Sequence, residues 1–344
     1  MGGSCHRDML HHLRCLAWRS GYGAQQSHSY LPGMHRNRIR KGSVQLDIKA
    51  TISKLHLNRG IVQAAATLLT NIHLPNFLKG AIYTGEGKAV CVPGLNCYSC
   101  PGAAGACPIG SFQAVIGSSK FNFSYYITGI LILIGVLAGR LICGFLCPFG
   151  WFQELLHKIP SPKFSTRKVW PLRYLKYVIL IAAVWLMGVF LVDQLGIAAP
   201  YFCKYLCPQG ILEGAIPLSI ASPEIRSALG SLFTWKLVLL ATVVISSVFL
   251  YRPFCKWICP LGAFYSLFNK ISFYRYRVDH DKCVSCGKCK RECKMDVDMS
   301  RQANALECIR CGECMKACPA RAISTSLSEA FPRGSGKHEV RERT

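Results

Sequence analysis

The chain has 344 residues, of which 51% are apolar and only 17% are charged, and it contains 20 cysteines. This composition is too apolar for an ordinary soluble domain, and it also excludes a chain that is disordered throughout. A disulfide-rich secreted miniprotein is excluded because the chain is too long and its cysteines cluster in metal-ligand spacings. A membrane protein that carries thiolate-bound metal remains.

The net charge is +24, from 41 Lys and Arg against 17 Asp and Glu. Nucleic acid is not expected as a partner, because the basic residues gather between apolar segments instead of forming one binding face. Each bound [4Fe–4S] cluster with four thiolates would also remove about two units of positive charge.

Residues 1–54 are predicted to be a basic leader without packed structure, since no periodic apolar pattern supports an element there. A metal-binding tail or an Arg-rich transit peptide is the alternative. Four apolar segments follow, at 61–78, 125–142, 172–195 and 232–251. Each is near the roughly 20 residues that a membrane-spanning helix needs, and backbone polar groups in lipid require helices rather than strands.

Lys and Arg in the connecting loops predict the orientation of these segments. They gather before the first segment, between the second and third, and after the fourth, which places both termini in the cytoplasm. We therefore expect a multi-pass protein of the inner (plasma) membrane, with a four-helix membrane domain at 55–277. Residues 201–222 are too short to span and are expected to be re-entrant or interfacial.

The strongest motif is a double ferredoxin run near the C-terminus. Its spacing is C-x2-C-x2-C-x3-C, given by Cys283, Cys286, Cys289 and Cys293 and repeated by Cys308, Cys311, Cys314 and Cys318. Three thiolates at such close intervals wrap a short loop around one corner of a cubane, while the fourth, after a turn, binds the neighbouring cluster. The first ferredoxin set is then Cys283, Cys286, Cys289 and Cys318, and the second ferredoxin set is Cys293, Cys308, Cys311 and Cys314.

Zinc or disulfides are the alternatives for these eight cysteines. Zinc sites pair their CxxC units over longer gaps, and cytoplasmic placement opposes disulfides. One departure is Lys294 after Cys293, where the bacterial ferredoxin pattern has proline. We expect two [4Fe–4S] clusters in a small α+β domain at 278–320, followed by a polar tail at 321–344.

A second group of cysteines follows a repeat, C-x3-C-P-x-G, at 143–150, 203–210 and 255–262. A fourth C-P-x-G stands at 107–110, preceded by Cys97 and Cys100. Thiols at i and i+4 share a helix face, and the proline ends or restarts the helix. Each motif therefore presents two thiols together.

The predicted topology divides these cysteines between the two membrane faces. The inner set is Cys143, Cys147, Cys255 and Cys259, and the outer set is Cys107, Cys203 and Cys207 with Cys97 or Cys100. Two parallel half-repeats about an axis normal to the membrane would bring each set together. Two further iron–sulfur clusters are thus candidates, against structural thiols or, on the outer face, disulfides. Cys91 and Cys97 stay open as disulfide partners or spare ligands.

The distance between such sites is a difficulty, because a hydrocarbon core of about 30 Å is long for one electron hop. We expect both sites inside the ends of the bilayer, or a quinone or further carrier between them.

The paired C-x3-C-P motifs, together with the double ferredoxin run, resemble the NapH-like family of membrane-bound ferredoxins. Related pieces occur in the C-terminal half of NosR-type proteins and in CcoG-type proteins. The resemblance covers about residues 55–320. It implies four membrane helices and electron transfer between a cytoplasmic donor or the quinone pool and a redox partner beyond the membrane. The outer cysteines depart from the family pattern and favour a transmembrane relay.

No nucleophile–base pair, phosphate loop or substrate clamp is visible, so no catalytic residue is predicted and enzyme activity stays open. The expected fold is an α-helical membrane protein with four transmembrane helices in two parallel half-repeats, plus the ferredoxin domain. A CcoG-like copper reductase or assembly factor and a redox-sensing regulator are alternatives. None of the seven methionines lies in the outer loops, and this argues against the copper-handling alternative, because copper favours Met and Cys ligands. Donor, acceptor, direction of electron flow and oligomeric state do not follow from the sequence.

Overall fold

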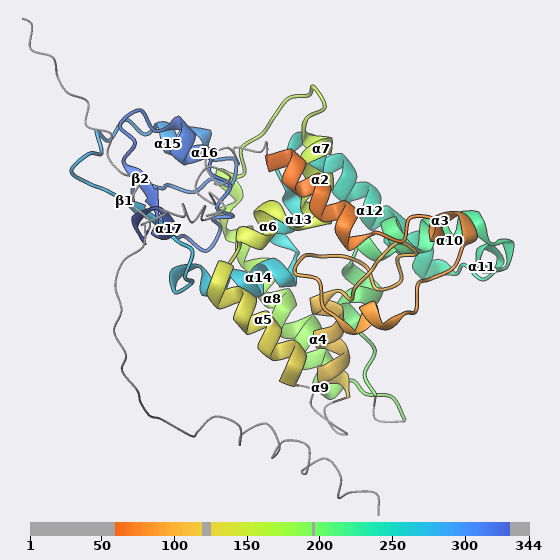
Figure 1. Cartoon of the computed structure of the whole chain (residues 1–344). Coiled ribbons are helices and arrows are strands. Elements are labelled where there is room, and N and C mark those ends of the chain that lie inside the picture. Colours follow the sequence, from red (N-terminus) through yellow and green to blue (C-terminus); the bar gives the residue numbers. More distant parts are fainter. Residues whose placement is uncertain (1–58, 119–124, 195–196, 331–344) are drawn as a thin grey trace, which may run out of the picture. The chain divides into compact units, whose positions relative to one another are not determined.

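The computed structural model describes residues 59–118, 125–194 and 197–330 (Figure 1). The predicted leader and residues 331–344 of the predicted tail lie outside the described residues. All described residues belong to one compact unit of the chain. They form a helical part, followed from residue 276 by a small C-terminal module with the only two named strands among the described residues.

The helical part begins with short helices joined by an irregular segment. These are α2 (Arg59–Thr70), α3 (Asn76–Lys79), η1 (Glu86–Ala89), α4 (Pro108–Gly117), α5 (Tyr125–Ala138), α6 (Leu141–Phe145) and α7 (Pro148–His157). It continues with η2 (Arg167–Tyr174), α8 (Leu175–Ile179), η3 (Leu180–Leu186), α9 (Met187–Phe190), η4 (Phe202–Leu206), η5 (Gly210–Ala215), α10 (Ile216–Ala221) and α11 (Pro223–Ser227). It ends with α12 (Ser231–Phe249), α13 (Pro253–Trp257), α14 (Pro260–Leu267) and η6 (Phe268–Lys270).

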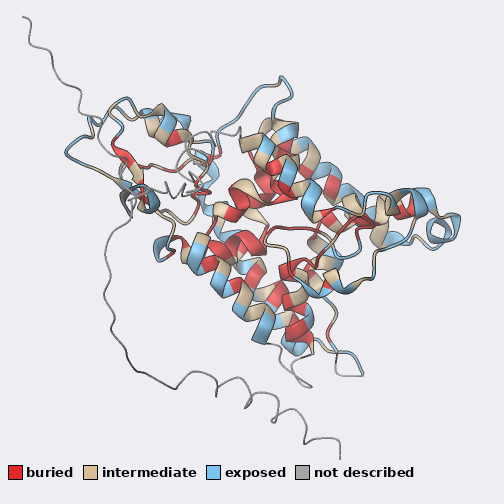
Figure 2. Cartoon of the chain, in the orientation of Figure 1, coloured by how far each residue is buried: buried red, intermediate tan, exposed pale blue. Residues whose placement is uncertain are grey.

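Two helical runs among the described residues are long and apolar enough to cross a membrane, Arg167–Phe190 and Ser231–Phe249. Their most apolar windows have mean hydropathies of 1.7 and 2.0, yet only 28% and 17% of these windows is buried. Their apolar side chains therefore face outward, unlike those of a core helix in a soluble protein, and Figure 2 shows exposed residues along α12. This pattern indicates membrane association.

The other two predicted spans form shorter helices. Where 61–78 was expected, α2 ends at Thr70, and the Asn71 side chain donates to the Thr67 carbonyl instead of continuing the helix. Where 125–142 was expected, α5 ends at Ala138, because Gly139 takes a left-handed φ of 52°. Four membrane-spanning helices therefore stay a prediction.

The C-terminal module (residues 276–330) contains β1 (Tyr276–Val278), α15 (Lys288–Glu292), α16 (Glu313–Ala317), β2 (Ile323–Thr325) and α17 (Ser326–Ala330). The strands pair antiparallel, with Tyr276 opposite Thr325 and Val278 opposite Ile323. The two cysteine runs lie between the strands, so the sheet closes the module around them.

The C-P-x-G motifs form junctions between helices. Cys107, Cys147 and Cys259 are the N-cap residues of α4, α7 and α14, each followed by proline at the first helical position. At the last of these junctions the Gly262 amide donates to the Cys259 sulfur over 3.3 Å. In the motif at 143–150, Cys143 lies in α6 and Cys147 begins α7. The two thiols of this motif therefore lie on successive helices instead of on one helical face.

Buried side chains of the helical part and of the C-terminal module belong to one hydrophobic core. It includes Phe149, Phe254 and Tyr265 of the helices together with Tyr276 and Ile309 of the module. The two parts are therefore packed against each other, which positions the cysteine sets described next.

Candidate functional site

The first ferredoxin set lines one cavity in the C-terminal module. Cys283, Cys286, Cys289 and Cys318 surround a space of ≈ 420 Å³ together with apolar and small residues such as Val278. These are the four cysteines that the spacing predicted for one cluster, with the fourth thiol contributed by the second run.

The second ferredoxin set also lies together. Burial raises the pKa of Cys308 to about 11, and the neighbouring Cys311 and Cys293 thiols add to that rise. Burial likewise raises the pKa of Cys314, which is also close to Cys308, Cys311 and Cys293. The structure thus brings Cys293 of the first run to three cysteines of the second run.

The inner set lines a cavity of its own, between α6, α7, α13 and α14. Cys143, Cys147, Cys255 and Cys259 surround a space that Leu95 and Tyr265 also line. Burial raises the pKa of Cys147 to about 12, with further contributions from Cys255 and Cys143. Buried thiols of this kind lose their protons only when a bound cation compensates the thiolate charge.

Two arginines without solvent exposure flank the inner set. Arg140 and Arg252 are both 0% exposed. Arg140 donates to the Cys255 carbonyl over 3.3 Å, and Arg252 donates to the Cys143 carbonyl. The two guanidinium groups place positive charge beside four thiols, which suits an anionic cluster.

The outer set is assembled from Cys97, Cys107, Cys203 and Cys207. Burial, followed by the nearby Cys207, raises the pKa of Cys97 to about 12. Burial, followed by Cys207, Cys107 and Cys97, raises the pKa of Cys203. The Lys236 side chain donates to the Cys203 carbonyl over 3.2 Å, so a cation also lies at this set.

Cys100 and Cys91 have other neighbours. The Cys100 sulfur is 3.5 Å from Oδ1 of Asn71, and Cys91 forms a β-bridge with Ala106. Of Cys97 and Cys100, the two alternatives for the fourth member of the outer set, the structure therefore brings Cys97 to the other three thiols. All 18 described cysteines, Cys91 and Cys97 included, are free thiols.

The inner and outer sets are close neighbours. A Cβ atom at Gly94 would lie 2.8 Å from the Cys147 Cα atom of the inner set. Two residues earlier, the Val92 N–H donates over 3.0 Å to the carbonyl of Ala106, which directly precedes Cys107 of the outer set. The segment 92–94 therefore contacts both sets. The buried ring of Tyr265 also lines the cavity of the inner set, and its hydroxyl donates to the Pro93 carbonyl over 3.1 Å.

A cluster and a single metal ion require different arrangements of their thiolates. Among the described residues, no three His, Cys, Asp or Glu side chains lie close enough to hold one ion. A zinc site brings its thiolates within about 2.3 Å of one ion, whereas each thiolate of a cubane binds a different iron. The thiols of the first ferredoxin set and of the inner set each surround a cavity, and cysteine thiolates are the ligands that [4Fe–4S] clusters take.

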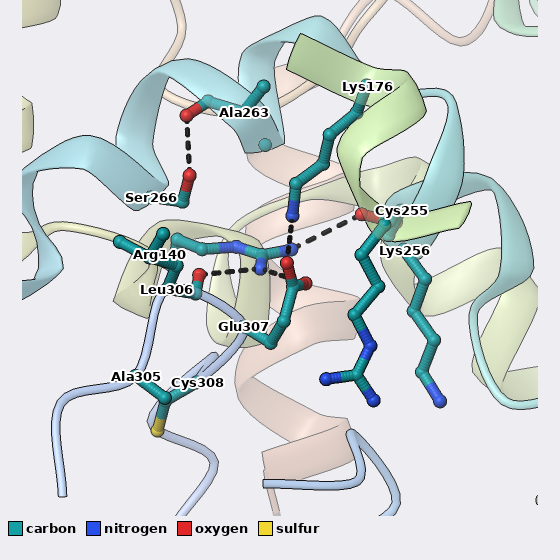
Figure 3. Close-up of polar contacts among 12 residues, drawn as sticks. Arg140, Lys176, Cys255, Lys256, Ala263, Ser266, Ala305, Leu306, Glu307 and Cys308 are labelled. Atoms are coloured by element: carbon teal, nitrogen blue, oxygen red, sulfur yellow. Dashed lines mark hydrogen bonds and ion pairs between the residues drawn. The ribbon is translucent and has the colours of Figure 1, made fainter. Parts of the chain in front are cut away.

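The C-terminal module is joined to the inner set by buried ion pairs (Figure 3). Glu307, directly before Cys308, accepts from Arg140 over 2.9 Å and from Lys176 over 2.6 Å. Arg140 also donates to the Leu306 carbonyl over 2.9 Å, so one side chain contacts both the second ferredoxin run and the Cys255 backbone.

Backbone contact brings the same two segments together. A Cβ atom at Gly144 would lie 2.5 Å from the Ile309 carbonyl oxygen, so only glycine fits beside that loop. Gly144 follows Cys143 and Ile309 follows Cys308. The close approach therefore places the second ferredoxin set next to the inner set.

Comparison with known proteins identifies the repeats as iron–sulfur sequences. A 4Fe-4S binding domain model matches residues 123–167, 175–216 and 232–275, and a second 4Fe-4S binding domain model matches 303–324. Each of the three repeats of the first model contains one C-x3-C-P-x-G motif.

Similarity to known proteins supports the same family. A protein of Methanocaldococcus jannaschii, MJ0750, is 30% identical over 186 residues, which are 52% of this chain and 68% of that protein. The chain belongs to this family of 4Fe-4S ferredoxin-type proteins.

Further relatives include the putative electron transport protein YccM of Escherichia coli, 27% identical over 51% of this chain and 48% of that protein. The regulatory protein NosR of Pseudomonas aeruginosa is 25% identical over 47% of this chain and 21% of that protein. The chain thus covers about half or less of these two longer relatives. No solved structure matches. The predicted kinship with ferredoxin-type and NosR proteins is confirmed.

Four residues beside the inner and outer sets (together, the membrane cysteine sets) were missed by the sequence analysis. Arg140 and Arg252 each stand three residues before the first cysteine of an inner motif, and Gln113 and Gln153 each stand six residues after a C-P-x-G cysteine. The signal was present in the repeat itself, because extending the alignment of the motifs in both directions reveals both pairs.

Proposed function

We propose that this chain is a membrane-bound iron–sulfur protein that moves electrons between a cytoplasmic donor or the quinone pool and an extracytoplasmic redox partner. Bound [4Fe–4S] clusters would supply one-electron transfer, with the protein setting their potentials through burial, charge and hydrogen bonds. The relatives whose names refer to electron transport and ferredoxin support this class of function.

The observation that carries the proposal is the series formed by the four cysteine sets. The first and second ferredoxin sets exchange cysteines between their two runs. Arg140 then connects the second ferredoxin run to the Cys255 backbone of the inner set. The segment 92–94 contacts the inner set at Cys147 and the outer set at Ala106, directly before Cys107. Each set is therefore adjacent to the next.

The link through residues 92–94 bears on the distance across the membrane. The predicted difficulty was a separation comparable with the hydrocarbon core of about 30 Å. Three consecutive residues span at most about 10 Å, so the contact of segment 92–94 with both sets supports a separation well below the thickness of the hydrocarbon core. A quinone is therefore not required between the inner and outer sets, although it stays a candidate donor.

The proposed topology has four membrane helices in two half-repeats, with both termini and the ferredoxin domain in the cytoplasm. A reporter fused to the C-terminus tests this orientation, because the basic loops predict activity only for a reporter that functions in the cytoplasm. Activity of a reporter that functions only outside the cytoplasm would contradict the topology.

Iron and acid-labile sulfide in the anaerobically purified protein test the relay. We expect about sixteen iron atoms per chain, four for each set. About eight would restrict cluster binding to the two ferredoxin sets and contradict a relay through the membrane cysteines.

A further inference from the structure

Two glutamines occupy matching positions beside the membrane cysteine sets. Gln113 follows Cys107 by six residues in C-P-I-G-S-F-Q, and Gln153 follows Cys147 by six in C-P-F-G-W-F-Q. The side chains are 3% and 0% exposed. A buried primary amide must satisfy its donors and its acceptor within the protein, so its partners show what it does.

At the outer set, the Gln113 amide joins α4 to the segment that carries Cys203. Its oxygen accepts from the Phe202 backbone N–H over 3.0 Å. Its nitrogen donates to the Cys203 sulfur over 3.2 Å and to the Ile109 carbonyl over 3.2 Å. Because the Phe202 N–H can only donate, it fixes the amide oxygen on that side and directs the NH₂ group to the sulfur.

At the inner set, Gln153 makes the same three contacts. Its oxygen accepts from the Phe254 backbone N–H over 3.2 Å. Its nitrogen donates to the Cys255 sulfur over 3.2 Å and to the Phe149 carbonyl over 3.3 Å. Each set thus has one side-chain amide that donates to the sulfur of a cysteine contributed by the other motif.

The other two C-P-x-G motifs have different residues at this position. Six residues after Cys207, Glu213 accepts from the Cys97 backbone N–H over 3.2 Å. Six residues after Cys259, Tyr265 donates to the Pro93 carbonyl over 3.1 Å. All four positions therefore contact the backbone of another segment, but of these four residues only the two glutamines donate a side-chain hydrogen bond to a cysteine sulfur.

We infer that Gln113 and Gln153 are positioning residues that set the reduction potentials of the outer and inner sites, respectively. The inference rests on the proposed function, because it assumes that both sets bind a cluster. Reduction adds one electron to a cluster and breaks no bond, so the site becomes more negative by one charge. An N–H donor at a ligand sulfur stabilises that added charge and raises the reduction potential.

Methionine is the decisive substitution, because Q113M and Q153M remove the donor to sulfur without adding charge. In Q113E and Q153E the carboxylate keeps an oxygen for the Phe202 or Phe254 N–H, as Glu213 does for Cys97, but it loses the donor and adds a negative charge that itself lowers the reduction potential. The glutamate variants serve where the methionine variants do not fold. The variant at one set is the matched control for the other set.

The experiment is a dithionite titration of the anaerobically purified full-length chain, followed by electron paramagnetic resonance. C203S and C255S assign the signals of the outer and inner sites by removing them. We expect the Gln113 variants to lower the midpoint of the outer signal alone, and the Gln153 variants that of the inner signal alone. The expected change is about tenfold in the reduction equilibrium, which is about 59 mV for one electron.

The outcomes separate the inference from the proposed function. Unchanged midpoints in the variants, with both membrane signals present, would overturn the tuning role and leave the relay standing. The Glu and Met variants could both lose iron from the affected site while the cluster that remains there keeps its midpoint. That result would also overturn the inference, because the glutamine would then be structural only. Absence of both membrane signals from the unmodified protein would overturn the inference together with the relay.

Discussion

Arg140 and Arg252 cross over between the two inner cysteine motifs: each donates to the backbone carbonyl of the first cysteine in the other motif. Arg140 stands three residues before Cys143 and contacts Cys255, whereas Arg252 stands three residues before Cys255 and contacts Cys143. The exchange ties the two motifs together at the point where their four thiols meet. It also puts two buried cations beside a site that would hold an anionic cluster.

The variant R252Q tests this arrangement. The Arg252 guanidinium also pairs with Glu154 at 3.0 Å, so its removal leaves a partly buried carboxylate with less compensation. Breaking a buried pair by removing one partner costs about 3–5 kcal/mol. We expect a clear fall in the thermal unfolding temperature of the detergent-solubilised protein and partial loss of iron. R301Q, at an exposed position in the C-terminal module, is the control and should change neither quantity. Equal stability of the two variants would contradict the structural role of Arg252.

The ferredoxin sets are tested by one cysteine from each. Cys286 belongs to the first set and Cys311 to the second, and each thiolate holds a different iron. We expect C286S and C311S each to lower the iron content by about four atoms and to remove one signal of the reduced protein. The double variant should lose about eight. Full cluster content in the double variant would contradict the assignment of both sets.

Glu307 tests the contact between the C-terminal module and the helical part. Its carboxylate is shared by the buried Arg140 and Lys176, so E307Q leaves two buried cations without a counter-charge. We expect a loss of about 3–5 kcal/mol in stability and faster proteolysis of residues 276–330. E313Q is the matched control, because Glu313 pairs with Lys316 on the surface, where such a pair contributes about 0–1 kcal/mol. Unchanged proteolysis in E307Q would show that the module is held by other contacts.

The composition of each ferredoxin set was predictable because it depends on local spacing. A C-x2-C-x2-C loop supplies three thiolates to one cubane, and in two-cluster ferredoxins the fourth cysteine of the run binds the other cluster. The grouping of Cys318 with Cys283, and of Cys293 with Cys308, follows from that pattern. The cavity lined by the first set has the expected four members.

The membrane sets were predictable only in part. Alternation of motifs between the two faces groups Cys143 with Cys255, but it does not distinguish Cys97 from Cys100, which are three residues apart. That choice depends on the irregular segment before α4, where the Asn71 side chain lies against Cys100 and Glu213 accepts from the Cys97 amide. Neither contact has a periodicity that the sequence could reveal.

The lengths of the helices were the least predictable feature. Hydropathy alone extends a predicted helix as far as the apolar residues continue. The predicted ends at residues 78 and 142 therefore lie beyond the observed ends at Thr70 and Ala138. Helix ends depend on single residues, here a side-chain amide at Asn71 and a left-handed glycine at Gly139. The π-helical turns of η4 and η5 around Cys203 and Cys207 also have no sequence signature.

The identity of the fourth outer ligand is the last prediction. Cys97 lies close to Cys107 and Cys207, whereas the buried Cys100 lies against Asn71. We expect C97S to lose about four iron atoms and the outer signal, because a cubane needs four ligands. C100S is a matched control, since it changes the same atom only three residues away, and it should keep the iron content of the unmodified protein. Iron analysis and electron paramagnetic resonance of both variants measure the difference. Loss of the outer signal in C100S but not in C97S would reverse the assignment, and its retention in both would show that the outer set does not hold a four-thiolate cluster.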